Sequence, residues 1–161
     1  MLGAGRPVPD AVCPIASLPG YAVVFFVGAI GEELGWQGYA AAVLQGRYGA
    51  LQTALMAGPI WAGRHVIPYL QTRHTLSWVA SQCVRTIAAR VLMVWISRNA
   101  GGSVFVCAIF HMMIDVGEFM FPNYGSHYDP FIAATLMAAL AGLVSVLWGP
   151  KTLARFRFAR T

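Results

Sequence analysis

Long apolar stretches dominate this chain and limit what it can fold into. Five of them are candidates for membrane-spanning helices, near residues 21–44, 50–70, 76–96, 103–121 and 131–148. An α-helix needs about 20 apolar residues to cross the hydrocarbon core of a bilayer. Strand-like alternation is absent, and short connectors with turn-forming residues separate the stretches. The pattern predicts an all-α protein, a polytopic membrane bundle of about five spans with its active site inside the bundle.

The composition supports a membrane protein. Of the 161 residues, 58% are hydrophobic and 11% are charged, and the mean hydropathy is +0.61. Soluble domains carry about 25% charged residues, so this chain lacks the polar surface to cover a globule in water. The formal net charge of +5 is explained by anchoring to anionic lipid. A lipid bilayer is therefore an expected partner, and no nucleic-acid partner is expected.

The basic residues also predict an orientation and a division of the chain. If five spans alternate, Arg47, Arg98 and the basic C-terminal residues fall on one side, and the side richer in Lys and Arg is cytoplasmic. We predict a leader or truncated N-terminal edge over residues 1–20 and a transmembrane domain over 21–149. Residues 150–161 are then a basic cytoplasmic tail.

Ionisable residues inside the apolar stretches are the strongest sign of function. Such residues are costly in a membrane and are candidates for function by default. The first stretch carries Glu32 and Glu33, the second His65, and the fourth His111 and Asp115. His111 and Asp115 are four residues apart and share a helix face, whereas Glu32 and Glu33 point about 100° apart. Carboxylates and imidazoles can bind zinc, and they can equally activate a water and stabilise an oxyanion.

Three segments that contain these residues resemble the motifs of a known family. EELGWQGY is similar to the EExxxR motif of the CPBP family, the CAAX-prenyl-protease and bacteriocin-processing (type II CAAX) intramembrane proteases. WAGRHVIPY resembles the second motif, an aromatic residue followed by xxxH. FHMMIDV resembles the last motif, Hxxx followed by Asn or Asp. The order and spacing agree, and the resemblance covers residues 25–116.

The resemblance implies a CAAX-type intramembrane endopeptidase, in a bacterial plasma membrane, that acts on a peptide or a prenylated protein. Glu32 would activate the attacking water and Glu33 would support the site. His65, His111 and Asp115 would hold a metal or stabilise the oxyanion. A divalent metal such as zinc, held by Glu32, His65 and His111, and a metal-independent glutamate mechanism both remain open.

One departure from the motif bears on activity. Gln37 stands where the motif has Arg, which removes a cation that could pair with Glu33 one turn earlier. Glu33 is then either protonated or paired with Arg64, Arg85 or Arg90 of another helix. The alternative function is a catalytically inactive family member that acts as a membrane scaffold or immunity protein. An ion-coupled transporter is a third hypothesis, disfavoured by five spans without a visible repeat.

Other residues lead to predictions about packing. The small-residue spacing of Gly31 and Gly35 predicts the close approach of another helix. The five tryptophans are expected mostly as interfacial anchors. Glu118 is expected at the interface rather than beside Asp115, and Asp129 is expected to cap the last helix.

Overall fold

The computed structural model describes residues 12–72 and 74–154, and within them every regular element is a helix. The elements in chain order are η2 (Ile15–Ser17), α1 (Leu18–Glu33), the π-helical segment η3 (Leu34–Ala41), α2 (Ala42–Gln45), α3 (Ala50–Gln71), α4 (Leu76–Asn99), α5 (Val104–Phe119) and α6 (Pro130–Trp148). Each predicted apolar stretch corresponds to one long helix or helical run, so the predicted all-α bundle is confirmed. Much of the predicted leader, Arg73 and most of the predicted basic tail lie outside the described residues.

Within the part of the chain that the structure describes, three helical runs are long and apolar enough to cross a membrane, judged by length and composition. They are Ile15–Gln45, Leu76–Asn99 and Pro130–Trp148. Helix α5 has 16 residues, fewer than the roughly 20 that a span needs. Helix α3 runs without a break but contains two prolines, Pro59 and Pro68. The two less typical helices are therefore those that carry the histidines of the motifs.

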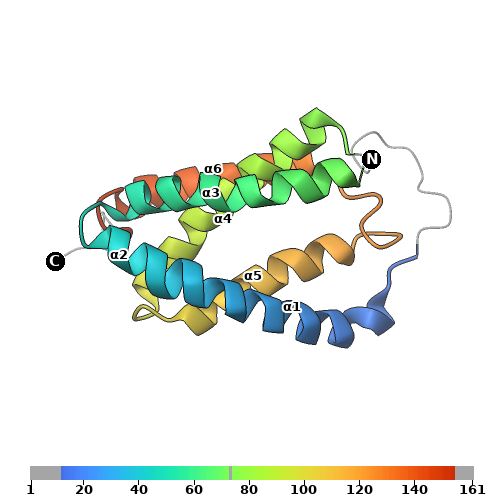
Figure 1. Cartoon of the computed structure of the whole chain (residues 1–161), viewed down its shortest axis with the longest axis horizontal. Coiled ribbons are helices and arrows are strands. Elements are labelled where there is room, and N and C mark those ends of the chain that lie inside the picture. The colour runs from blue at the N-terminus through green and yellow to red at the C-terminus, as the bar shows by residue number, and fades with distance from the viewer. Residues whose placement is uncertain (1–11, 73, 155–161) are drawn as a thin grey trace.

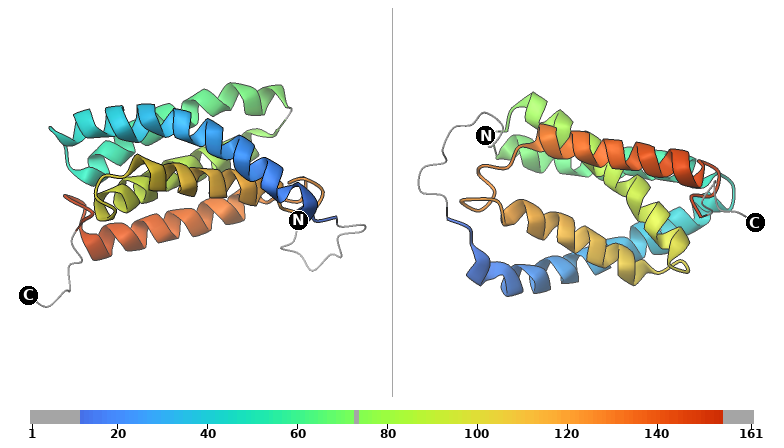
Figure 2. Two further views of the ribbon diagram at one scale, coloured as in Figure 1. Left: turned by 90° about the horizontal axis from the view of Figure 1, so that it is seen from below. Right: turned by 180° about the vertical axis from the view of Figure 1, so that it is seen from behind.

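Helix α4 is the centre of the bundle. Figure 1 shows α1 beside α5, with α4 crossing obliquely behind α3, and the view from below in Figure 2 shows α3 and α6 on opposite faces with α4 in the layer between them. The most extensive packing joins α3 to α4, α4 to α6, and α1 to α5. Most of α4 is buried, whereas α1 and α6 leave most of their apolar surface exposed. Exposed apolar faces of this kind suit contact with lipid.

The helix ends are fixed by local side-chain caps and by glycines. Thr75, Ser103 and Asp129 accept backbone N–H groups of the first turns of α4, α5 and α6, so the predicted cap at Asp129 is confirmed. Between α4 and α5 the chain reverses through Gly101 and Gly102, whose φ angles of 65° and 83° are ones that glycine adopts without steric cost. The cap at Ser103 fixes the first residue of α5, and thereby the position of His111 along the bundle.

The predicted close approach at Gly31 and Gly35 is wrong. A Cβ added at either position would meet nothing within 4 Å among the described residues. The helix is rotated about its axis so that the side bearing Glu33 is buried and the side bearing Gly31 and Gly35 is exposed. Helices come close instead at Gly58 of α3, where an added Cβ would lie 3.2 Å from Ile87 Cα of α4.

Candidate active site

The two adjacent glutamates lie where α1 passes into the π-helical segment η3. Segments of π-helix are rare and often occur at functional sites. The Glu33 side chain is fully buried, whereas that of Glu32 is 28% exposed. The two side chains thus point in different directions, as predicted, and each contacts a different set of residues.

Glu33 is bound by groups from two other helices. Arg90 of α4 donates to both carboxylate oxygens, Nη1 to Oε2 at 2.7 Å and Nη2 to Oε1 at 3.0 Å. His111 of α5 places its Nδ1 3.1 Å from Glu33 Oε1. Both side chains of the Arg90–Glu33 pair are fully buried. A bidentate, charge-assisted pair of this kind satisfies groups that would be costly to bury alone.

Glu32 is bound by two residues of α3. Trp61 Nε1 donates to Glu32 Oε2 at 3.1 Å, and Arg64 forms an ion pair with Oε1. The Trp61 ring also lies edge-on to His111, with the ring centroids 5.0 Å apart. Trp61 is therefore buried at the centre of the site, so the prediction of an interfacial tryptophan fails here. Its i, i+4 relation to His65 was the sequence signal for this position.

The second motif histidine, His65, is half-buried on α3. Arg64 Nε donates to its Nε2 at 3.4 Å, and its ring stacks on Tyr69 with centroids 5.9 Å apart. On α5, His111 Nε2 faces Asp115 Oδ2 at 3.6 Å, as the i, i+4 spacing predicts. That separation exceeds a direct hydrogen bond and is compatible with a bridging water.

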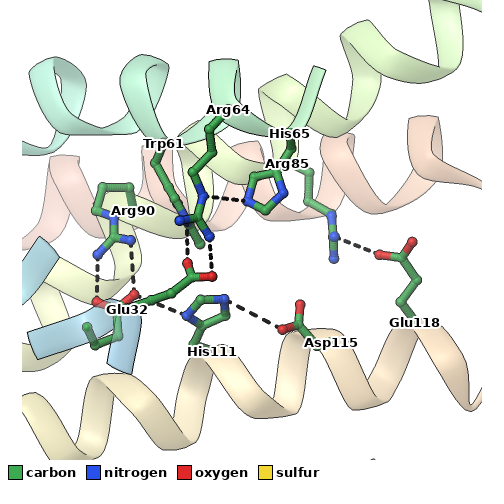
Figure 3. Close-up of polar contacts among 10 residues, drawn as sticks. Glu32, Trp61, Arg64, His65, Arg85, Arg90, His111, Asp115 and Glu118 are labelled. Carbon is green, nitrogen blue, oxygen red and sulfur yellow. Dashed lines mark hydrogen bonds and ion pairs between the residues drawn. The ribbon is translucent and has the colours of Figure 1, made fainter. Parts of the chain in front are cut away.

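A single small cavity joins these groups. Its volume is about 80 Å³, and Glu32, His65, His111 and Asp115 all line it, together with Trp61, Tyr69, Arg85, Thr86, Ala89 and Ile114. Figure 3 shows the four labelled groups reaching toward one another from three helices. Glu33 does not line the cavity but contacts it through His111. Four of the five predicted site residues thus share one cavity, and the fifth supports it.

The same side chains do not form a ready metal site. Among residues 12–72 and 74–154, no three or more His, Cys, Asp or Glu side chains are arranged to hold a metal ion. The Glu32 oxygens face Arg64 and Trp61, which compete with a metal for this carboxylate. A catalytic zinc ion needs three protein ligands besides a water, at about 2.0–2.3 Å, and the described side chains do not form such a set of three, so this donor set does not fit zinc.

The structure shows the partners of two further groups, which the sequence did not identify. Arg90 pairs with Glu33, which resolves the choice among three arginines that the sequence left open. Glu118 is not a free interfacial acid, because it accepts from Arg85 Nη2 at 2.7 Å and from Gln82 Nε2 at 3.1 Å. That pair links α5 to α4 beside the cavity. Arg64, Arg85 and Arg90 therefore each pair with a different carboxylate.

Comparison with known families agrees with this geometry. A model of the family described as type II CAAX prenyl endopeptidase Rce1-like matches residues 14–117, well over half of the chain. The match includes every residue that lines the cavity. Searches among curated proteins and among solved structures gave no match. With its exposed apolar helices, the chain is a membrane protein, and it belongs to the type II CAAX prenyl endopeptidase Rce1-like family.

Proposed function

We propose that this chain is an active intramembrane endopeptidase of the CAAX type, in which Glu32 activates the attacking water. The observation that carries the proposal is the shared cavity of Glu32, His65, His111 and Asp115. At about 30 Å³ of liquid volume per water, 80 Å³ accommodates the nucleophilic water. The substrate is a peptide or a prenylated protein held within the membrane.

Glu32 has the acceptor capacity that a general base needs. An ionised carboxylate offers about four lone-pair positions, and Trp61 and Arg64 take one on each oxygen. The remaining positions can accept a proton from a water about 2.6–3.2 Å away. The two donors also hold the carboxylate in place, so it does not have to be ordered when the substrate arrives.

In this proposal the two histidines have different roles, and their hydrogen bonds support the difference. His111 donates Nδ1–H to Glu33, because the Arg90 pair keeps Glu33 an acceptor, and neutral His111 then offers Nε2 as an acceptor for the water. His65 accepts at Nε2 from Arg64, so its proton is on Nδ1. That N–H and the Arg64 charge supply the electrostatic stabilisation of the developing oxyanion.

The reaction then needs only these groups. Glu32 takes a proton from the water while the water oxygen bonds to the carbonyl carbon. Negative charge develops on the carbonyl oxygen beside His65 and Arg64. The C–N bond then breaks, and Glu32 returns the proton to the leaving amine, which gives a carboxylic acid and an amine; the acid then loses its remaining proton to water.

The test is cleavage of a fluorogenic prenylated peptide by the purified protein in liposomes. We expect cleavage by the unaltered protein and a loss of about 10²–10⁴-fold in kcat/KM for Glu32→Gln, the range for a general base. The matched control is Asp129→Asn, another acid-to-amide change outside the cavity that keeps a good helix cap. Cleavage by Glu32→Gln at the unaltered rate would refute the proposal.

The second candidate is an inactive family member that acts as a membrane scaffold. Two observations favour it: Gln37 replaces the motif arginine, and both oxygens of Glu32 already have partners. In that case the unaltered protein and Glu32→Gln would both fold, and neither would cleave any reporter above the rate in empty liposomes.

A further inference from the structure

Arg90 and its partner Glu33 are fully buried charged side chains. The guanidinium carbon of Arg90 lies 4.1 Å from the ring centre of Trp61 and 5.8 Å from that of Trp36. Both terminal nitrogens are used by Glu33. Its Nε has no hydrogen-bond partner among the described residues. A guanidinium held between indole rings and one carboxylate has little freedom to do anything else.

The contacts of Arg90 lead to the cavity in two steps. Glu33 Oε1 accepts from Arg90 Nη2 and also lies 3.1 Å from His111 Nδ1. Neither Arg90 nor Glu33 lines the cavity, whereas His111 does. Arg90 can therefore influence a reaction through the orientation and protonation of His111, and also through Trp61, whose ring it contacts.

Gln37 explains why this charge has to come from α4. It is four residues after Glu33 and buried, and its Oε1 has no hydrogen-bond partner among the described residues. An arginine at this position would place a cation within one turn of Glu33. A neutral amide cannot compensate a buried carboxylate, so the compensating charge must come from another helix.

We infer that Arg90 is a positioning residue of the site: through Glu33 it holds His111 in the form that carries its proton on Nδ1, and it provides from α4 the charge that position 37 lacks. The effect on catalysis rests on the function proposed above. The effect on the His111 ring does not, because it is a property of the resting protein.

The first measurement is ¹⁵N NMR of the histidine rings in liposomes, with the His111 signal identified by its loss in His111→Gln. We expect a protonated Nδ1 and an unprotonated Nε2 in the unaltered protein. Arg90→Gln should remove this preference, so that the two nitrogen signals average or exchange character. The control is Arg85→Gln, which breaks the other arginine–glutamate pair of α4 and should leave the Nδ1-protonated form in place.

The second measurement uses a variant in which the arginine is moved from position 90 of α4 to position 37, on the same helical run as Glu33. In the double variant Arg90→Gln/Gln37→Arg, the new arginine lies one turn from Glu33, and we expect both folding and the Nδ1-protonated His111 signal to return. This variant keeps the inference testable if Arg90→Gln alone does not fold. A folded double variant without the Nδ1-protonated signal, or a folded Arg90→Gln with an unchanged signal, would overturn the inference.

Arg90→Lys separates positioning from bulk stability. It keeps the charge and loses the two-pronged hydrogen bonding. We expect a folded protein whose KM is unchanged and whose kcat falls by up to about 10²-fold, as for other small displacements of reacting groups. An unchanged kcat would count against the inference. If the unaltered protein cleaves nothing, the proposed protease function fails, while the NMR comparison still decides the role of Arg90.

Discussion

The same Glu-to-Gln substitution should mainly lower stability at Glu33 and mainly lower cleavage at Glu32. Glu33→Gln leaves Arg90 buried without its counter-charge, and the side chains of both residues are fully buried. Removing one partner of a buried ion pair costs about 3–5 kcal/mol. Because domains are stable by only about 5–15 kcal/mol, this variant should lose a large part of its free energy of unfolding.

Glu32→Gln should cost far less stability. The side chains of Glu32 and Arg64 are 28% and 42% exposed, and pairs of such exposure contribute about 0–1 kcal/mol. The amide oxygen of glutamine can still accept from Trp61 Nε1. We therefore expect a loss of about 1 kcal/mol or less in the free energy of unfolding, together with the loss of cleavage described above.

The assay is reversible denaturant unfolding in detergent micelles, followed by circular dichroism of the helices, for the unaltered protein and both variants. The stability difference between the two variants should be at least about 2 kcal/mol. Equal stabilities, or a Glu32→Gln variant less stable than Glu33→Gln, would refute the assignment of Glu33 to the structure and of Glu32 to the chemistry.

Three further outcomes are expected. Trp61→Phe removes the indole donor to Glu32 and should lower kcat/KM by about tenfold, since a hydrogen bond to a charged group contributes about 1.5–3 kcal/mol; unchanged kinetics would contradict the role of Trp61 in holding the base. Incubation with a zinc chelator should leave cleavage unchanged, because the side chains do not present a ligand set; inactivation that added zinc reverses would revive the metal-bound water. In Gly58→Val the added Cβ would lie 3.2 Å from Ile87 Cα, so this variant should be less stable by about 1–3 kcal/mol. The measurement is the midpoint of unfolding, which should fall for Gly58→Val and stay unchanged for the control Gly31→Val, whose added Cβ meets nothing within 4 Å.

The sequence was sufficient to predict the helices and their polar patches. Apolar length locates the helices, and the helical repeat places His111 with Asp115 and separates Glu32 from Glu33. Both are local properties, so a single sequence contains them. The resemblance to the family added which patches belong together, and the shared cavity agrees with it.

The pairing of charges could not be predicted in the same way. Which of Arg64, Arg85 and Arg90 meets which carboxylate depends on how far each helix is rotated about its axis when it packs. Three arginines and four acids on these helices allow several pairings of similar chemistry. The π-helical turn after Glu33 and the central position of Trp61 are set by the same tertiary packing, as is the exposure of Gly31.

The central claim is that polar groups from α1, α3 and α5 meet inside the bundle. The most direct test is the distance between ¹³C-labelled glutamate carboxyls and ¹⁵N-labelled histidine rings, measured by solid-state NMR in lipid. The account predicts a strong carbon–nitrogen coupling between Glu33 and His111, consistent with the 3.1 Å contact of Oε1 and Nδ1, which disappears in His111→Gln. A His111 ring with no glutamate carboxyl near it in the unaltered protein would contradict the account.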